Sequence, residues 1–177
     1  MDRMFAPWRI EWVERDAPDE ETGCVFCAFE AAEADRENRV VARSDRGLVL
    51  LNNYPYNPGH VMVIPARHTG EYAGLSDEEL LDHARLKRRT FRAMETAFSP
   101  DGFNAGYNLG RGAGGSIDDH LHAHVVPRWE GDTNFMPVIG ETKVIVQALE
   151  ETYDRLYDAF GGLDGAEASD DGAVRFG

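Results

Sequence analysis

The sequence lacks the features that mark membrane-bound, secreted and repeat proteins. None of its apolar runs approaches the roughly 18–20 residues that a membrane-spanning helix needs. Its start, MDRMFAPWRIEWVERD, carries charges and Pro7 where a secretory signal has an uninterrupted apolar segment. There is also no internal repeat of the length typical of solenoid proteins. We therefore expect a soluble protein located in the cytoplasm.

Basic residues are scarce, because 18 Lys and Arg face 32 Asp and Glu and leave a formal net charge of −14. Such an acidic excess argues against broad contact with the phosphate backbone of a nucleic acid. Any phosphate-binding site must therefore be local and built from a few hydrogen-bond donors.

A length of 177 residues suits one domain, and its pattern predicts an α+β fold. We expect an N-terminal arm at 1–22, a globular domain at 23–160 and a disordered acidic tail at 161–177, where no hydrophobic period is visible. Strands are predicted from short apolar runs between turn signals, and helices from apolar spacing and from a capping box at Ser76 and Glu79. The predicted elements are a short helix at 27–38, strands at 40–43, 47–52, 60–65, 103–109 and 120–127, and two main helices at 76–98 and within 138–160.

The only two cysteines form one Cys-x-x-Cys pair, Cys24 and Cys27. In a cytosolic chain such a pair indicates a metal site or a redox site. A closed zinc site needs two further Cys or His ligands. His68 directly follows the predicted strand at 60–65, whereas His83 lies in the long helix, where we expect it to be solvated. The residues therefore favour Cys24, Cys27, His68 and one histidine from the row at 120–124.

Three of the six histidines, His120, His122 and His124, stand at alternate positions. A strand points alternate side chains to one face, so the three rings should share a face. The polar face of an edge strand would carry mixed residue types, which makes this alternative a poor match. A zinc site built from three histidines is a stronger alternative, because imidazole is a common transition-metal ligand.

A glycine-rich segment, NLGRGAGGS at 108–116, immediately precedes the histidine row. Glycines allow close approach of the backbone to a ligand, and successive N–H groups in such turns bind anions. A loose hairpin loop is the alternative, but the adjacent histidines favour a phosphate-binding loop.

These motifs resemble the histidine triad (HIT) family of nucleotide hydrolases and transferases, whose signature alternates three histidines with apolar residues. Here the signature reads HLHAHVV at 120–126, and it is accompanied by PGHVMVIPARH at 58–68. The APWRIEW start, the cysteine pair and the NYPYNPGH turn are similar to the branch of the family that includes diadenosine tetraphosphate phosphorylase. The resemblance implies a HIT-like fold with an antiparallel sheet of about five strands and two main helices, assembled as a homodimer.

The resemblance also implies roles for individual residues. His122 would be the nucleophile that forms an adenylyl-histidine intermediate, and His124 would act near the phosphate and the leaving group. Further nucleotide contacts would come from Asn52 at the ribose and from the phosphate loop, at Asn108, Gly115 and Ser116. His60 fits a position that orients the histidine strand.

Cysteine-bearing members of the family hold structural zinc with two cysteines, a histidine after the second conserved strand and the first triad histidine. These ligands correspond to Cys24, Cys27, His68 and His120. The loop departs from the family at Gly115, where many members have Gln, and one extra residue precedes His120. Because Asp118 and Asp119 would repel a phosphate, we expect their carboxylates to turn away from the loop.

The implied activity is hydrolysis or nucleotidyl transfer on adenine nucleotides such as diadenosine tetraphosphate. The sequence leaves open whether water or inorganic phosphate is the acceptor. Two other classes remain open at this stage: a zinc-stabilised nucleotide-binding module without turnover, and a redox protein that uses Cys24 and Cys27.

Overall fold

A single mixed sheet organises the protein, whose computed structural model describes residues 23–115, 117–132, 148–169 and 172–177. The strand order is β4-β5-β3-β2-β1-β7-β6. All pairings are antiparallel except that of β1 with β7. The strands are β1 (Val40–Ser44), β2 (Gly47–Leu51), β3 (Val61–Pro65), β4 (Gly102–Tyr107), β5 (Ala123–Arg128), β6 (Glu167–Ala168) and β7 (Val174–Phe176).

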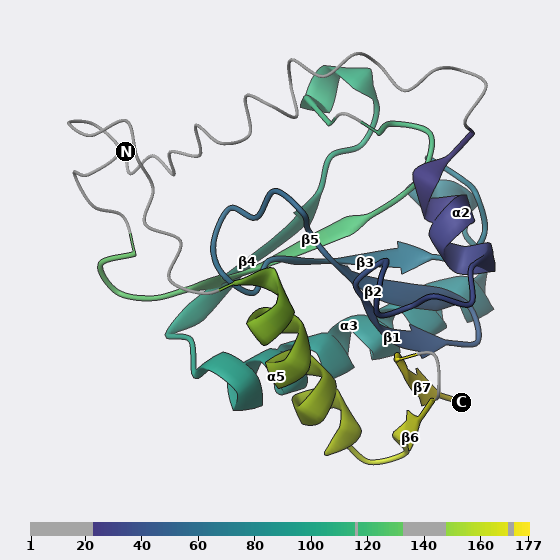
Figure 1. The fold of residues 1–177 in the computed structure, drawn as a ribbon. Helices are drawn as coiled ribbons and strands as arrows, with labels where there is room; N and C mark the ends of the chain where they lie inside the picture. Colours follow the sequence, from purple (N-terminus) through teal and green to yellow (C-terminus); the bar gives the residue numbers. More distant parts are fainter. Residues whose placement is uncertain (1–22, 116, 133–147, 170–171) are drawn as a thin grey trace.

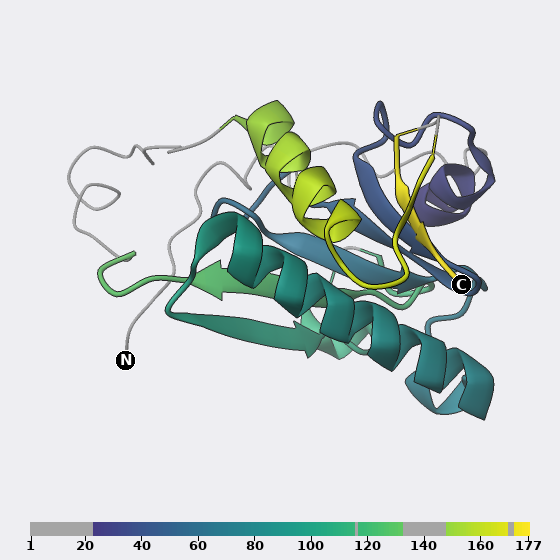
Figure 2. The same ribbon diagram turned by 90° about the horizontal axis from the view of Figure 1, so that it is seen from below.

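Helices cover the two faces of the sheet unequally (Figures 1 and 2). The long helix α3 (Asp77–Phe98) and α5 (Leu149–Gly161) pack on one face, against buried side chains such as Val49 and Val63. The short helix α2 (Val25–Ala31) packs on the other face through Phe26, because alternate strand residues point that way. Within the described ranges, no helix combines the length and apolar character needed to cross a bilayer.

The predicted α+β class is confirmed, and the described residues form seven strands in place of about five. The predicted capping box of α3 is also present, since the Ser76 side chain accepts from the Glu79 N–H and the Glu79 side chain accepts from the Ser76 N–H. The predicted helix at 27–38 is shorter, and the helix within 138–160 begins at Leu149. The N-terminal arm at 1–22 and residues 133–147 lie outside the described residues.

The segment after Gly161, predicted to be a disordered tail, instead adds β6 and β7 to the sheet. Strand β7 pairs in parallel with β1 and buries Val174 and Phe176 in the core. An apolar segment of three or four residues is too short to produce a recognisable hydrophobic period, although it is long enough to pair with an edge strand.

His83 was expected to be solvated, and this expectation is wrong. Its ring is only 4% exposed, and its Nε2 atom lies 2.7 Å from the Tyr107 hydroxyl, which also accepts a hydrogen bond from Lys87 Nζ. The ring is therefore held in the core by a hydrogen bond between Nε2 and this hydroxyl. Burial, together with the charge of Lys87, lowers the pKa of His83 from 6.5 to about 4.

We predict that acid destabilises the protein through His83. In the unfolded chain His83 gains a proton near its ordinary pKa of 6.5, whereas the folded state resists protonation until about pH 4. Stability is therefore complete above pH 6.5 and falls as the pH drops toward 4, by about 3 kcal/mol. Urea unfolding at pH 7 and pH 4 measures this loss. The His83→Gln variant should lose less, and equal losses in both proteins would contradict the prediction.

Candidate active site and metal centre

The three histidines meet where β5 begins. The predicted strand at 120–127 is shorter in the structure, so that His120 and His122 precede β5 and only His124 lies within it, opposite Met62 of β3. Ala123 and Val125 pack into the core on the α3 side, as the alternation predicted. The rings of His122 and His124 lie side by side, with centroids 5.0 Å apart.

His122 presents an unprotonated ring nitrogen. Its Nδ1 atom is 2.9 Å from the backbone carbonyl oxygen of His120. A carbonyl oxygen only accepts hydrogen bonds, so the ring proton resides on Nδ1 and Nε2 keeps its lone pair. Burial lowers the pKa of His122, and the bond to His120 opposes this effect only in part, so the ring is neutral at pH 7. A neutral imidazole with a fixed tautomer is a competent nucleophile.

His124 has the opposite tautomer. The backbone N–H of Tyr56 donates to His60 Nδ1 over 3.2 Å, so the proton of the neutral His60 ring resides on Nε2. That Nε2–H group lies 3.0 Å from Nδ1 of His124 and donates to it. The proton of His124 is consequently on Nε2. One site thus presents a nucleophilic nitrogen on His122 and a hydrogen-bond-donating N–H group on His124.

The four predicted metal ligands lie together at the start of α2. The ligand atoms of Cys24, Cys27, His68 and His120 are all within 4.8 Å of one another. Cys24 Sγ is 3.2 Å from His120 Nδ1, and Cys27 Sγ is 3.3 Å from His68 Nδ1. The two cysteines share one side of the first turn because they are three residues apart.

The surroundings of these ligands fit a zinc ion. His120 Nε2 donates to the carbonyl oxygen of Pro65 over 2.8 Å, and His68 Nε2 lies 3.8 Å from a carboxylate oxygen of Asp119. Outer acceptors of this kind direct the other ring nitrogen toward a metal. Burial and the neighbouring Cys24 raise the pKa of the Cys27 thiol to about 11. A cation between the two sulfur atoms would favour the thiolate form that zinc requires.

The predicted nucleotide contacts lie around the same face of the sheet. Asn52 is buried just after β2, where its side-chain oxygen accepts from the Tyr54 N–H and its amide nitrogen points to Met62 Sδ. Asn108 and Gly115 close the glycine loop, since a Cβ atom at Gly115 would lie 3.2 Å from Cβ of Asn108. A larger residue at this position would therefore require Asn108 to shift by a few tenths of an ångström. Ser116 lies outside the described residues.

The acidic pair before the triad has two different partners. Asp118 accepts a hydrogen bond from Arg111 Nε over 3.0 Å, so it bridges the glycine loop, whereas Asp119 faces His68. The expectation that both carboxylates turn away from the glycine loop therefore holds for Asp119, which is directed toward the cluster of metal ligands, but not for Asp118, which bonds to an arginine of the loop.

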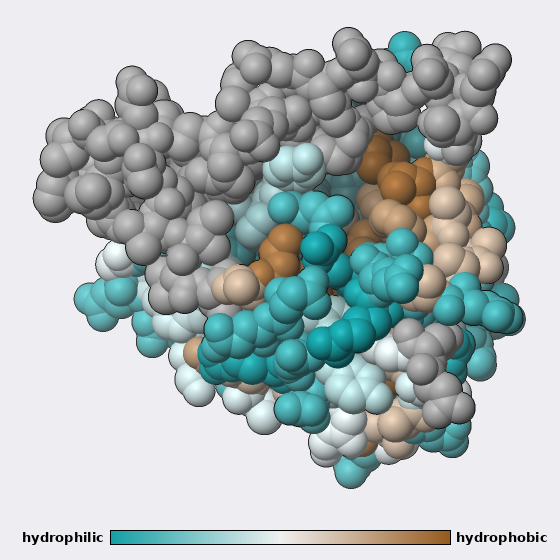
Figure 3. Space-filling view, viewed as in Figure 1, coloured by the Kyte–Doolittle hydropathy of each residue, from teal (hydrophilic) through white to brown (hydrophobic). Residues whose placement is uncertain are grey.

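Two aromatic residues in the site were not singled out from the sequence. The Phe26 ring packs 5.4 Å from both His120 and His122, and the Tyr56 ring stacks on His60 at 5.1 Å. Phe26 lies between the two cysteines, which was the only available signal. In Figure 3, apolar surface gathers next to α2 on the visible face of the molecule.

A sheet that brings three alternating histidines beside a glycine loop defines a nucleotide-processing class of site, and the comparisons with known proteins agree. Residues 33–131 match the model of the HIT domain, so the chain belongs to the HIT family. AP-4-A phosphorylase of Mycobacterium tuberculosis is 41% identical over 158 residues, which cover 86% of this chain and 80% of that protein. An uncharacterized HIT-like protein of Methanocaldococcus jannaschii is 32% identical over 68% of this chain and 89% of its own length.

Solved structures show the same fold. A zinc-bound histidine triad family protein from Mycobacterium smegmatis superposes with a TM-score of 0.66 at 29% identity, covering 81% of this chain and 96% of that one. A histidine triad nucleotide-binding protein from Sulfolobus tokodaii gives a TM-score of 0.59 at 28% identity, with 77% and 89% covered. The family and the HIT-like fold predicted from the sequence are therefore confirmed.

Proposed function

We propose that the protein is a nucleotidyl hydrolase or transferase that cleaves adenine dinucleotides such as diadenosine tetraphosphate through an adenylyl-His122 intermediate. The opposite tautomers of His122 and His124 carry this proposal, because they place a nucleophile beside a hydrogen-bond donor that can stabilise the charge on the phosphate and the leaving group. The likeness to AP-4-A phosphorylase supports the choice of substrate.

In the first step, Nε2 of His122 attacks the α-phosphorus and forms a P–N bond while the P–O bond to the leaving nucleotide breaks. The departing phosphate oxygen accepts a hydrogen bond from the Nε2–H group of His124, whose ring is held by His60, and the nucleotide leaves as its anion while His124 keeps its proton. Charge on the phosphoryl oxygens is met by N–H groups of the loop at 108–116. In the second step, the oxygen of the incoming water or phosphate forms a P–O bond while the P–N bond to His122 breaks, which releases the nucleotide; the proton of the incoming group passes to solvent.

We assign substrate binding to the residues that surround His122 and His124. Asn52 would hold the ribose, while Asn108, Gly115 and Ser116 would hold the phosphates together with His122 and His124. Phe26 and Met62 would supply apolar contacts for the base, since both lie on the same side of the sheet as the histidines. Flat bases are commonly bound by apolar side chains beside a few polar ones.

Zinc would be held by Cys24, Cys27, His68 and His120 in a structural role. With four protein ligands the ion has no open position for a substrate, so it would supply cross-linking of α2 to the end of the sheet. The zinc-bound family structure supports this assignment.

We also propose that the protein acts in the cytoplasm as a homodimer. Strand β4 ends the sheet, and its middle residues Asn104, Ala105 and Gly106 are exposed. An exposed edge strand with unpaired backbone groups is a natural place for pairing with a second copy.

Incubation with diadenosine tetraphosphate, with and without inorganic phosphate, tests the proposed activity. Chromatography that shows ADP and ATP only when phosphate is present identifies a phosphorylase, and AMP and ATP without phosphate identify a hydrolase. An untouched substrate that nevertheless binds would contradict the enzyme proposal and indicate a nucleotide-binding module.

A further inference from the structure

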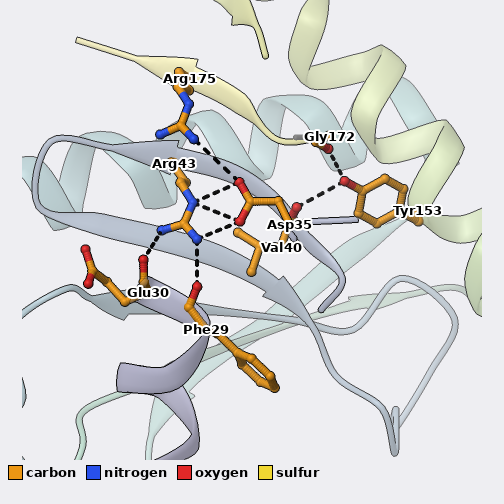
Figure 4. Close-up of polar contacts among 8 residues, drawn as sticks. All are labelled: Phe29, Glu30, Asp35, Val40, Arg43, Tyr153, Gly172 and Arg175. Carbon is orange, nitrogen blue, oxygen red and sulfur yellow. Dashed lines mark hydrogen bonds and ion pairs between the residues drawn. The ribbon is translucent and has the colours of Figure 1, made fainter. Parts of the chain in front are cut away.

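A buried ion-pair network lies at the C-terminal end of α2 (Figure 4). The carboxylate of Asp35 is fully buried, and Arg43 donates to it from Nε and Nη2 over 2.6–3.0 Å. On its other side, Asp35 faces Arg175 of β7 at 3.8 Å. A buried carboxylate needs such cationic partners, because removing it from water is costly.

Arg43 also holds the end of α2. Its Nη1 and Nη2 atoms donate to the carbonyl oxygens of Glu30 and Phe29, over 3.2 and 2.7 Å. These carbonyls lie in the last turn of the helix, where intrahelical partners are missing. Helix α2 has seven residues, no side-chain cap at its start and no basic residue in its last turn. So short a helix is not stable by itself, and its orientation depends on such external contacts.

The C-terminal strand is the third part of the network. Arg43 and Arg175 are register partners in the parallel pairing of β1 with β7. The hydroxyl of Tyr153 on α5 lies between the carbonyl oxygens of Val40 and Gly172, and so anchors the beginning of both strands (Figure 4). Strand β7 is thereby fixed next to Asp35.

We propose that Arg43 and Arg175 are positioning residues for the metal site. Through Asp35, the C-terminal strand fixes the guanidinium of Arg43, and Arg43 fixes the helix whose first turn carries Cys24 and Cys27. Zinc affinity therefore depends on an arginine of β7, a strand far from Cys24 and Cys27 in the sequence. This inference rests on the zinc site of the proposed function.

Zinc affinity, measured by competition with a metallochromic chelator, tests the inference without any assay of activity. The Arg43→Lys variant keeps the positive charge. It loses the planar guanidinium group, which bonds at the same time to Asp35 and to the backbone carbonyl oxygens of Phe29 and Glu30. We expect its zinc dissociation constant to rise about 10-fold, the lower end of the effect of outer-shell substitutions. Arg175→Gln should shift the constant in the same direction by about 3-fold, and Arg175→Lys should restore most of the affinity.

Arg128→Gln is the matched control, because it removes an arginine that forms an ion pair with Asp132, at the end of β5 opposite to His120 and outside the network of Asp35, Arg43 and Arg175. Its zinc dissociation constant should equal that of the native protein. If the Arg43 and Arg175 variants lower thermal stability without weakening zinc binding, the network is merely structural and the inference is overturned. A native protein that binds no zinc would instead overturn the proposed metal site, and the inference with it.

Discussion

Replacing His122 with alanine is expected to lower the turnover number about 10⁴-fold or more, with AMP binding largely preserved. The loss should be large because the variant has no nitrogen that can form the covalent intermediate, and removal of a nucleophile is among the costliest single changes in an active site. Binding should survive, since the loop at 108–116, Asn52 and His124 remain in place.

Initial rates with diadenosine tetraphosphate and calorimetric titration with AMP measure the two effects separately. Mass spectrometry of the native protein, quenched in alkaline denaturant during turnover, should detect one added adenylyl group that is absent from the variant. His83→Gln at pH 7.5 is a suitable control, because His83 bonds to Tyr107 and has no contact with the triad among the described residues. Near-native turnover by His122→Ala would refute the covalent mechanism.

Removal of zinc is expected to lower the free energy of unfolding by about 4 kcal/mol when free zinc stands about 1,000-fold above its dissociation constant. A ligand that binds only the folded state stabilises it by mass action, and the four ligand atoms come together only in the folded chain. Treatment with a strong chelator and the Cys27→Ser variant should both produce this loss.

Thermal unfolding with and without added zinc measures the stabilisation, and elemental analysis gives the metal content. Val25→Ala is the matched control on the same helix, since Val25 is 40% exposed and does not belong to the cluster. A native protein whose unfolding does not respond to the chelator would contradict the metal site. Stoichiometric zinc without thiol-disulfide exchange would exclude the alternative redox role of Cys24 and Cys27.

The candidate site could be largely predicted from sequence because its residues stand in short motifs. The alternation of His120, His122 and His124 indicated a shared face, and the cysteine pair with His68 indicated a metal cluster, which the structure brings together. The spacing could not show that His120 turns its Nδ1 atom toward the two cysteines. This orientation depends on where β5 begins, and the strand begins only at Ala123.

Long-range pairings were beyond prediction. Asp35, Arg43 and Arg175 each look like an ordinary solvated charge in a chain with 28% charged residues. Their burial depends on β7 meeting β1, and no local pattern encodes that pairing. His83 was misjudged for the same reason, because its partner Tyr107 belongs to a distant strand.

The line of hydrogen bonds from Tyr56 through His60 to His124 has a directional consequence. It begins at a peptide N–H group, which neither releases nor accepts a proton at neutral pH, so the direction of every donor along the line is imposed by the backbone. A reversed His60 ring would face this amide with a second N–H and lose its hydrogen bond. The turn at 52–60 therefore fixes the tautomer of His124, with its proton on Nε2, through a backbone group that no change of side-chain protonation can reverse.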